Sequence, residues 1–109
     1  MELYLIRHTS VAVPKGICYG GTDVELSNTF EEEAAVVKSR LEGLKFDAVF
    51  TSPLSRAVKL AAFCGYADAQ KDERLKELNF GEWEMKSFDN LYKEDERFRE
   101  WCEGDYVNL

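Results

Sequence analysis

The sequence predicts an α/β fold in which a mainly parallel sheet is flanked by helices. Two short and almost wholly apolar runs, residues 2–7 (ELYLIR) and 47–52 (DAVFTS), have the pattern of strands buried on both faces. Each run is followed, directly or after a loop, by a segment whose apolar residues have helical spacing. Such alternation of strands and helices is typical of a parallel sheet with helices packed on it.

The first strand leads into a long loop and then a helix. Residues 9–28 are rich in Gly, Pro, Ser and Asn, which predicts an ordered loop of the length that is usually functional in small domains. Residues 29–32 (TFEE) fit a capping box, and apolar residues then recur at steps of three and four. This spacing predicts an amphipathic helix over residues 30–43.

The second strand leads directly into a second helix. Ser52 and Pro53 fit the N-cap and the first helical position, and the helix should end before Gly65. Residues 71–84 have no clear period and should be extended, with a turn at Gly81.

Helical spacing returns over residues 87–102, with Ser87 as the cap. We find no internal repeat or linker, and we therefore expect residues 1–109 to form a single domain.

Composition excludes several classes of function. The net charge is −7 and no basic cluster occurs, so neither nucleic acid nor an anionic membrane is expected as a partner. The apolar opening is too short for a membrane span and lacks the features of a signal peptide, which favours a cytoplasmic protein. Cys18, Cys64 and Cys102 are odd in number and widely spaced, which predicts reduced thiols rather than disulfides or a metal site.

Charged side chains follow both predicted strands. Arg7 and His8 stand where the first strand should end, and Arg56 follows the second strand in the first turn of the next helix. Ligands of open α/β sheets bind outside the carboxyl ends of the strands. If the two strands are neighbours, two guanidinium groups, an imidazole and a helix N-terminus meet there, as in a phosphate site.

Four ordered motifs within residues 3–84 carry a resemblance to a known family. The motifs are LYLIRHT, YGGTDVELS, VFTSPLSRAVKLA and DERLKELNFGEWE. With these motifs the sequence resembles the histidine phosphatase (phosphoglycerate mutase-like) superfamily, and the second motif is most similar to bacterial alpha-ribazole phosphatases.

The resemblance implies roles for four residues. His8 would be the nucleophile that becomes a phosphohistidine, and Arg7 and Arg56 would grip the phosphoryl oxygens. Glu77 would serve as general acid and then as general base. The ring nitrogen of His8 that does not attack should donate to a backbone carbonyl, which fixes the tautomer.

Other carboxylates and a loop complete the candidate site. Glu82 and Glu84 are nearby rivals of Glu77, although each could equally be a solvated surface carboxylate. The resemblance implies that a substrate loop is formed by Gly20, Gly21, Thr22 and Asp23. An ordinary turn stabilised by Asp23 is the alternative.

The sequence also departs from the family pattern. Thr9 stands where the family usually has glycine, and Pro14 where it often has asparagine, so the hydroxyl of Thr9 or Ser10 could act as a substitute donor. The family carries a second histidine late in the fold, whereas His8 is the one histidine here. We therefore expect a domain that lacks its C-terminal part, covers about two-thirds of the usual length and has little activity alone.

The expected function is a phosphomonoesterase without a cofactor, acting on a small phosphorylated substrate. The similarity to alpha-ribazole phosphatases implies alpha-ribazole 5'-phosphate, in the nucleotide-loop branch of cobalamin biosynthesis. A phosphoglycerate mutase-type phosphotransferase and a non-catalytic phosphate-binding module remain as alternatives. An incomplete sheet would expose an unpaired edge, which favours a homodimer.

Overall fold

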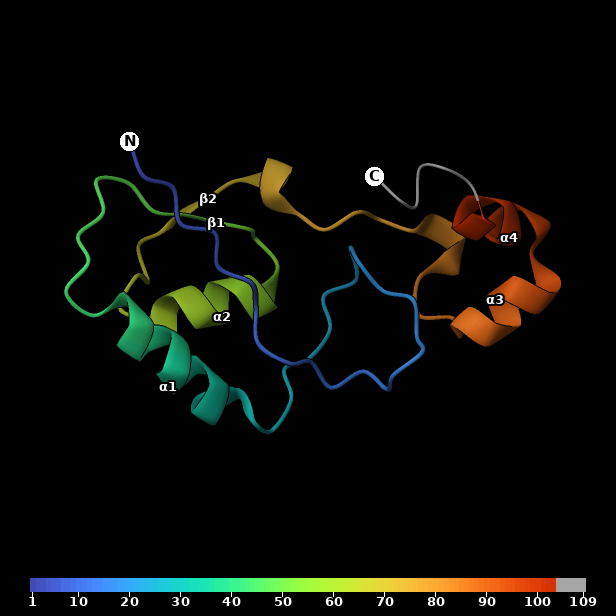
Figure 1. The fold of residues 1–109 in the computed structure, drawn as a ribbon, viewed down its shortest axis with the longest axis horizontal. Coiled ribbons are helices and arrows are strands. Elements are labelled where there is room, and N and C mark those ends of the chain that lie inside the picture. Colours follow the sequence, from blue (N-terminus) through green and yellow to red (C-terminus); the bar gives the residue numbers. More distant parts are fainter. Residues whose placement is uncertain (104–109) are drawn as a thin grey trace. The chain divides into compact units, whose positions relative to one another are not determined.

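The computed structural model describes residues 1–103, which fall into two compact units. Unit 1 comprises residues 1–13 and 23–77, and unit 2 comprises residues 14–22 and the chain from 78 onward (Figure 1). A single domain over residues 1–109 stays a prediction.

Unit 1 has the predicted α/β architecture. Helix α1 spans Phe30–Leu41 and helix α2 spans Ser55–Phe63. Strand β1 (Phe50–Thr51) pairs in parallel with strand β2 (Gln70–Lys71). The fold class, a parallel sheet flanked by helices, is thus confirmed, although each strand is only two residues long.

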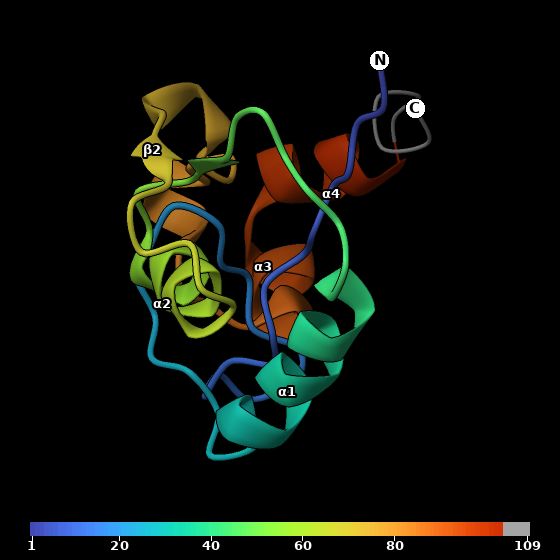
Figure 2. The same ribbon diagram turned by 90° about the vertical axis from the view of Figure 1, so that its left-hand side faces the viewer.

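The two helices of unit 1 pack against each other through aromatic rings. Phe30 at the start of α1 meets Phe63 at the end of α2 edge to face, with 5.7 Å between ring centroids. Figure 2 shows the two helices beside each other, with residues 1–8 running past them. A short 3₁₀ turn, η1 (Glu73–Leu75), follows β2.

The first predicted strand, residues 2–7, is not formed. Within residues 1–103 its backbone has no ladder partner, and Leu3 and Leu5 are 76% and 87% exposed. An apolar run becomes a strand only where a neighbouring chain accepts and donates its backbone hydrogen bonds. Here the run and β1 line the same cavity but do not pair, so the prediction of a strand over residues 2–7 is wrong.

The predicted start of α1 is confirmed, but its capping box is not. Thr29 is the N-cap, yet its hydroxyl donates to the carboxylate of Glu33 over 2.6 Å instead of capping a backbone N–H. The helix ends at Leu41, two residues before the predicted end.

The predicted start of α2 is wrong by two residues. The helix begins at Ser55 with Leu54 as N-cap, and the side chain of Leu54 cannot cap it. Asp23 supplies the missing acceptor, because the Ser55 N–H and hydroxyl both donate to its Oδ1 over 2.9 and 2.6 Å. A carboxylate from a distant loop thus replaces the local N-cap that the sequence suggested.

Unit 2 contains a 3₁₀ turn and two helices. The turn η2 spans Gly81–Trp83, which agrees with the predicted turn at Gly81, and helices α3 and α4 span Phe88–Glu94 and Glu96–Glu103. Ser87 caps α3 as predicted, by accepting from the Asn90 N–H.

One helix was predicted where α3 and α4 stand. Asp95 interrupts it with an extended backbone, and its carboxylate accepts from the Phe98 N–H over 3.1 Å and from the Trp83 indole over 3.0 Å. The break lets aromatic side chains from both helices gather on one core. That core consists of Cys18, Leu91 and Phe98, surrounded by Phe80, Trp83, Trp101 and Cys102.

The described residues hold no disulfide and no cluster of metal-ligating side chains. Cys18 is a buried free thiol, and Cys64 and Cys102 are partly buried free thiols. Burial raises the pKa of all three thiols. No helix in residues 1–103 has both the length and the apolar character needed to cross a membrane.

Candidate functional site

A cavity of about 600 Å³ in unit 1 brings together the residues predicted for catalysis. Its wall is formed by residues 2–8, by the facing sides of α1 and α2, by residues 48–52 and by the chain around η1. Arg7, His8, Arg56 and Glu77 all line it. Four side chains from three separate parts of the sequence therefore line one cavity.

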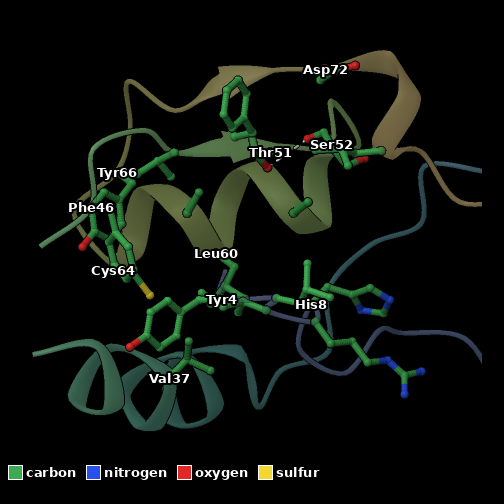
Figure 3. A pocket seen from close by; sticks show the side chains of 18 of the residues that line it. Tyr4, His8, Val37, Phe46, Thr51, Ser52, Leu60, Cys64, Tyr66 and Asp72 are labelled. Carbon is green, nitrogen blue, oxygen red and sulfur yellow. Dashed lines mark hydrogen bonds between the residues drawn. The ribbon is translucent and has the colours of Figure 1, made fainter. Parts of the chain in front are cut away.

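The two ends of this cavity differ in polarity. Figure 3 shows His8, Ser52 and Asp72 toward one end, whereas Tyr4 and Cys64 lie at the other with further apolar side chains. An apolar pocket with a few convergent polar groups is the usual form of a small-molecule site. A charged group would bind at the end that holds His8, and an apolar moiety at the other.

His8 is held in one tautomer by a backbone hydrogen bond. Its Nδ1 lies 2.7 Å from the carbonyl oxygen of Thr9. A carbonyl can only accept, so Nδ1 carries a proton, and in the neutral form of the imidazole the lone pair lies on Nε2. The hydrogen bond of one ring nitrogen to a backbone carbonyl is thus present as expected, and a nucleophilic role of Nε2 stays a prediction.

The guanidinium of Arg56 is unusually well buried. The residue is only 1% exposed and lies in the first turn of α2. Its position follows from Asp23, which caps this turn through Ser55. The Ser55 hydroxyl and N–H hold the pKa of Asp23 below its ordinary value, and the positive charge of Arg56 lowers it further.

Asp23 was predicted as part of a substrate loop. The structure shows its carboxylate at the start of α2, where hydrogen bonds from Ser55 and the positive charge of Arg56 lower its pKa. The buried side chain of Arg56 lines the cavity. A contact of Asp23 with substrate stays a prediction.

A further arginine lines the cavity that the sequence analysis did not single out. Arg74 in η1 donates from Nη2 and Nε to the two carboxylate oxygens of Asp72 over 2.7 and 3.0 Å. Hydrogen bonds from Arg74 lower the pKa of Asp72 to about 2. The only sequence signal was its position after β2, a strand that the sequence analysis did not predict.

Of the three candidate carboxylates, only Glu77 lines the cavity. It is exposed there, at the end of unit 1. Glu82 belongs to unit 2 and forms an exposed ion pair with Arg97 at 3.2 Å. The structure therefore supports Glu77 over Glu82 as the residue that could exchange protons with a ligand in the cavity.

Glu84 accepts hydrogen bonds inside unit 2. Its Oε1 accepts from the N–H groups of Gly20 and Thr22 over 3.1 and 3.0 Å and from the Thr22 hydroxyl over 2.5 Å, while Oε2 accepts from the Phe80 N–H over 2.8 Å. Burial raises the pKa of Glu84, but these bonds outweigh it and lower the pKa to about 2. A carboxyl with so low a pKa is a poor general acid at neutral pH.

The predicted substrate loop is packed tightly in unit 2. A Cβ on Gly20 would lie 2.0 Å from the carbonyl oxygen of Leu78, and one on Gly21 would lie 3.2 Å from Cβ of Asn79. Gly20 is thus required by close packing. The hydrogen bonds from this loop to Glu84 have no local sequence signal, because Gly20 and Thr22 lie 64 and 62 residues away from Glu84. Substrate contacts of Gly20, Gly21 and Thr22 stay predictions.

The two hydroxyls that could replace a missing phosphate donor have different surroundings. The Ser10 hydroxyl donates to Glu33 over 2.9 Å. The Thr9 hydroxyl is buried and has no hydrogen-bond partner in the described part of the chain.

The cavity of this α/β unit is lined by an imidazole, two guanidinium groups and a carboxyl group. These groups are expected of a protein that binds and transfers a phosphoryl group. Residues 3–108 match the family model of the histidine phosphatase superfamily (branch 1), and the chain belongs to this superfamily.

Individual relatives agree with this assignment. The chain is 34% identical over 107 residues to the adenosylcobalamin/alpha-ribazole phosphatase of Escherichia coli K12, covering 94% of this chain and 53% of that protein. It is 32% identical over 105 residues to a probable phosphoglycerate mutase GpmB of Escherichia fergusonii, covering 91% and 48%. A solved structure of a putative alpha-ribazole-5'-P phosphatase from Escherichia coli K-12 superposes with a TM-score of 0.78 at 32% identity, covering 89% and 52%.

The chain spans about half the length of the relatives that it matches. This share is smaller than the two-thirds that the sequence motifs suggested.

Proposed function

We propose that the chain carries the nucleophilic part of a phosphomonoesterase that works through a phosphohistidine at His8. The observation that carries the proposal is a cavity lined by Arg7, His8, Arg56 and Glu77, together with the hydrogen bond from Nδ1 of His8 to the Thr9 carbonyl. An imidazole with a fixed tautomer, beside fixed positive charge, is suited to attack a phosphorus atom.

The reaction takes two steps. Nε2 attacks the phosphorus, the ester oxygen leaves with its bonding electrons, and Glu77 gives it a proton. Water then attacks the phosphohistidine, Glu77 takes a proton from that water, and inorganic phosphate and free His8 are regenerated. Arg7 and Arg56 stabilise the negative charge on the equatorial oxygens in both steps.

Alpha-ribazole 5'-phosphate is the substrate that we propose. A relative and a solved structure, both from Escherichia coli K-12, carry alpha-ribazole phosphatase in their names. The apolar end of the cavity offers Tyr4, Phe46 and Tyr66 to an aromatic moiety, and the polar end offers His8 to its phosphate. The proposed place of the protein is therefore in cobalamin biosynthesis.

A phosphoglycerate mutase-type transfer is the second candidate, because one relative is named a probable phosphoglycerate mutase. The first step would be the same, but the phosphoryl group would pass to a sugar acid instead of water. Measuring inorganic phosphate against phosphorylated sugar acid as the product separates the two functions.

The covalent intermediate provides the decisive test. The chain is mixed with p-nitrophenyl phosphate, quenched in base and mapped for a phosphoryl group by mass spectrometry. We expect an adduct on His8, none in His8→Ala, and a larger amount in Glu77→Gln. The nitrophenolate leaves readily without an acid, whereas hydrolysis of the intermediate still needs a base, so Glu77→Gln should accumulate the adduct.

Glu82→Gln is the matched control, because it removes the same charge from a carboxylate outside the cavity. Equal hydrolysis by the unaltered chain and by His8→Ala, or an adduct on another residue, would contradict the proposal. No adduct in either the unaltered chain or Glu77→Gln would favour the non-catalytic binding module.

A further inference from the structure

We propose that Glu33 is a positioning residue for His8 and acts on it through the Thr9–Ser10 peptide group. The inference deepens the proposed function and rests on it, since it concerns the same nucleophile. It is carried by hydrogen bonds that join helix α1 to the chain directly after His8.

Two hydrogen-bonding groups of Ser10 converge on one carboxylate oxygen. The Ser10 N–H donates to Oε1 of Glu33 over 3.0 Å, and the Ser10 hydroxyl donates to the same oxygen over 2.9 Å. The other oxygen, Oε2, accepts from the Thr29 hydroxyl over 2.6 Å. Glu33 thus lies in the first turn of α1 with both carboxylate oxygens engaged.

The peptide group between Thr9 and Ser10 is shared by two hydrogen bonds. Its N–H donates to Glu33, and its carbonyl accepts from Nδ1 of His8 over 2.7 Å. Because a peptide group is planar, fixing its N–H also fixes the direction of its carbonyl. Glu33 therefore orients the acceptor that determines which ring nitrogen of His8 carries the proton.

The charge of Glu33 strengthens this arrangement as well as orienting it. A hydrogen bond from a peptide N–H to a carboxylate is stronger than one to a neutral acceptor. Hydrogen bonds in series polarise one another, so the Thr9 carbonyl becomes a better acceptor for Nδ1–H. The result resembles a carboxylate that orients an imidazole directly, except that one peptide group stands between them.

Neighbouring contacts keep the segment in place. The Ser27 N–H donates to the Ser10 carbonyl over 3.0 Å, and Val11 forms an antiparallel bridge with Leu26. Hydrogen bonds from the Thr29 hydroxyl and from Ser10 hold the pKa of Glu33 below its ordinary value. The carboxylate is thus ionised at neutral pH, where it must act.

The test uses the fact that His8 is the one histidine in the chain. Long-range ¹H–¹⁵N correlation spectra of the imidazole, recorded well above the pH at which histidine is protonated, give the ratio of its two tautomers. The Nδ1–H form should predominate in the unaltered chain. In Glu33→Gln we expect the ratio of Nδ1–H to Nε2–H to fall about fivefold, with a larger fall in Glu33→Ala.

Two further variants separate positioning from general loss of structure. Glu32→Gln removes the same charge from an exposed neighbour on the same helix and should leave the ratio unchanged. Ser10→Ala removes the hydroxyl but keeps the N–H that donates to Glu33, so the Nδ1–H form should still predominate. Circular dichroism establishes that each variant keeps its helices.

An unchanged tautomer ratio in a folded Glu33→Gln variant would overturn the inference. An equal fall in Glu32→Gln would overturn it too, because the effect would then be one of overall charge. The measurement needs no turnover, so a failure of the proposed phosphatase function would be seen separately, in the adduct experiment on His8.

Discussion

Three carboxylates in one short stretch of chain have different surroundings and therefore different chemistry. Glu77 is exposed at the cavity of unit 1, Glu82 forms a surface ion pair, and Glu84 accepts four hydrogen bonds in unit 2. Surface ion pairs contribute little to stability, whereas a partly buried carboxylate that accepts backbone N–H groups contributes more. Residue type alone does not separate these roles.

Glu84 should make the stability of unit 2 depend on pH. Its pKa is lowered from an ordinary 4.5 to about 2 in the folded chain. The folded state therefore prefers the ionised form, and the stabilisation is complete above about 4.5 and lost as the pH falls toward about 2. Urea unfolding followed by tryptophan fluorescence at several pH values measures this, since Trp83 and Trp101 both lie in unit 2.

In Glu84→Gln we expect the free energy of unfolding to fall by about 1–3 kcal/mol at neutral pH. In the acid range, the free energy of unfolding of this variant should depend less on pH than that of the unaltered chain. The neutral amide offers one acceptor oxygen to a site where four donors converge. Glu82→Gln is the control and should change stability by less than about 0.5 kcal/mol. If the stability of Glu84→Gln falls with acid as much as that of the unaltered chain, other carboxylates determine the pH dependence.

At the scale of elements, unit 2 depends on the close approach of residues 14–22 to residues 78–88. The Cys18 N–H donates to the Lys86 carbonyl over 2.8 Å, and the Met85 N–H donates to the Cys18 carbonyl over 2.6 Å. Gly20 lies where a side chain would meet the backbone of Leu78. Packing between segments, and not the preference of either one, determines this part of the fold.

Gly20→Ala should therefore destabilise unit 2 more than Gly21→Ala. The Cβ introduced at position 20 would approach the Leu78 carbonyl to 2.0 Å, so the backbone would have to move, at a cost of about 1–3 kcal/mol. The Cβ introduced at position 21 would meet the Asn79 side chain at 3.2 Å, and a small shift relieves that contact. Denaturation midpoints from tryptophan fluorescence compare the two variants; equal midpoints would contradict the packing argument.

Helices were the elements that the sequence predicted best. Apolar spacing located α1 and α2, and Ser87 marked the start of α3, because these signals are local. The start of α2 was misjudged because its cap, Asp23, is 32 residues away. The break at Asp95 was missed although its carboxylate accepts from the nearby Phe98 N–H; its other hydrogen bond comes from Trp83, 12 residues away, and has no local sequence signal.

The candidate site was likewise predicted where the sequence signal is local, and missed where it depends on contacts between distant residues. The motifs identified Arg7, His8, Arg56 and Glu77, which share one cavity. The contacts of Glu33 with Ser10 were missed, since the two residues are 23 positions apart and their pairing has no local sequence signal. Strand 2–7 was predicted from its apolar run alone, and such a run becomes a strand only where a partner is present.

For the molecule as a whole, the main consequence of that unformed strand is exposed apolar surface. Residues 3–6 (LYLI) are all at least 46% exposed, and Phe50 in β1 is 53% exposed. Within the described residues, strand β1 pairs on one side only, with β2. Exposed apolar residues beside an unpaired strand edge favour pairing with another chain.

We therefore expect the chain to self-associate, with a mass by light scattering that exceeds the 12.5 kDa of a monomer at high concentration and falls on dilution. Leu5→Lys should shift this equilibrium toward the monomer, because a lysine on the exposed apolar surface of residues 3–6 opposes the burial of that surface against another chain. Val36→Lys is the control, since Val36 is 52% exposed on α1 but does not line the cavity. A monomeric mass for the unaltered chain at high concentration would contradict the expectation, and an equal effect of both lysines would assign the association to charge and not to the apolar surface of residues 3–6.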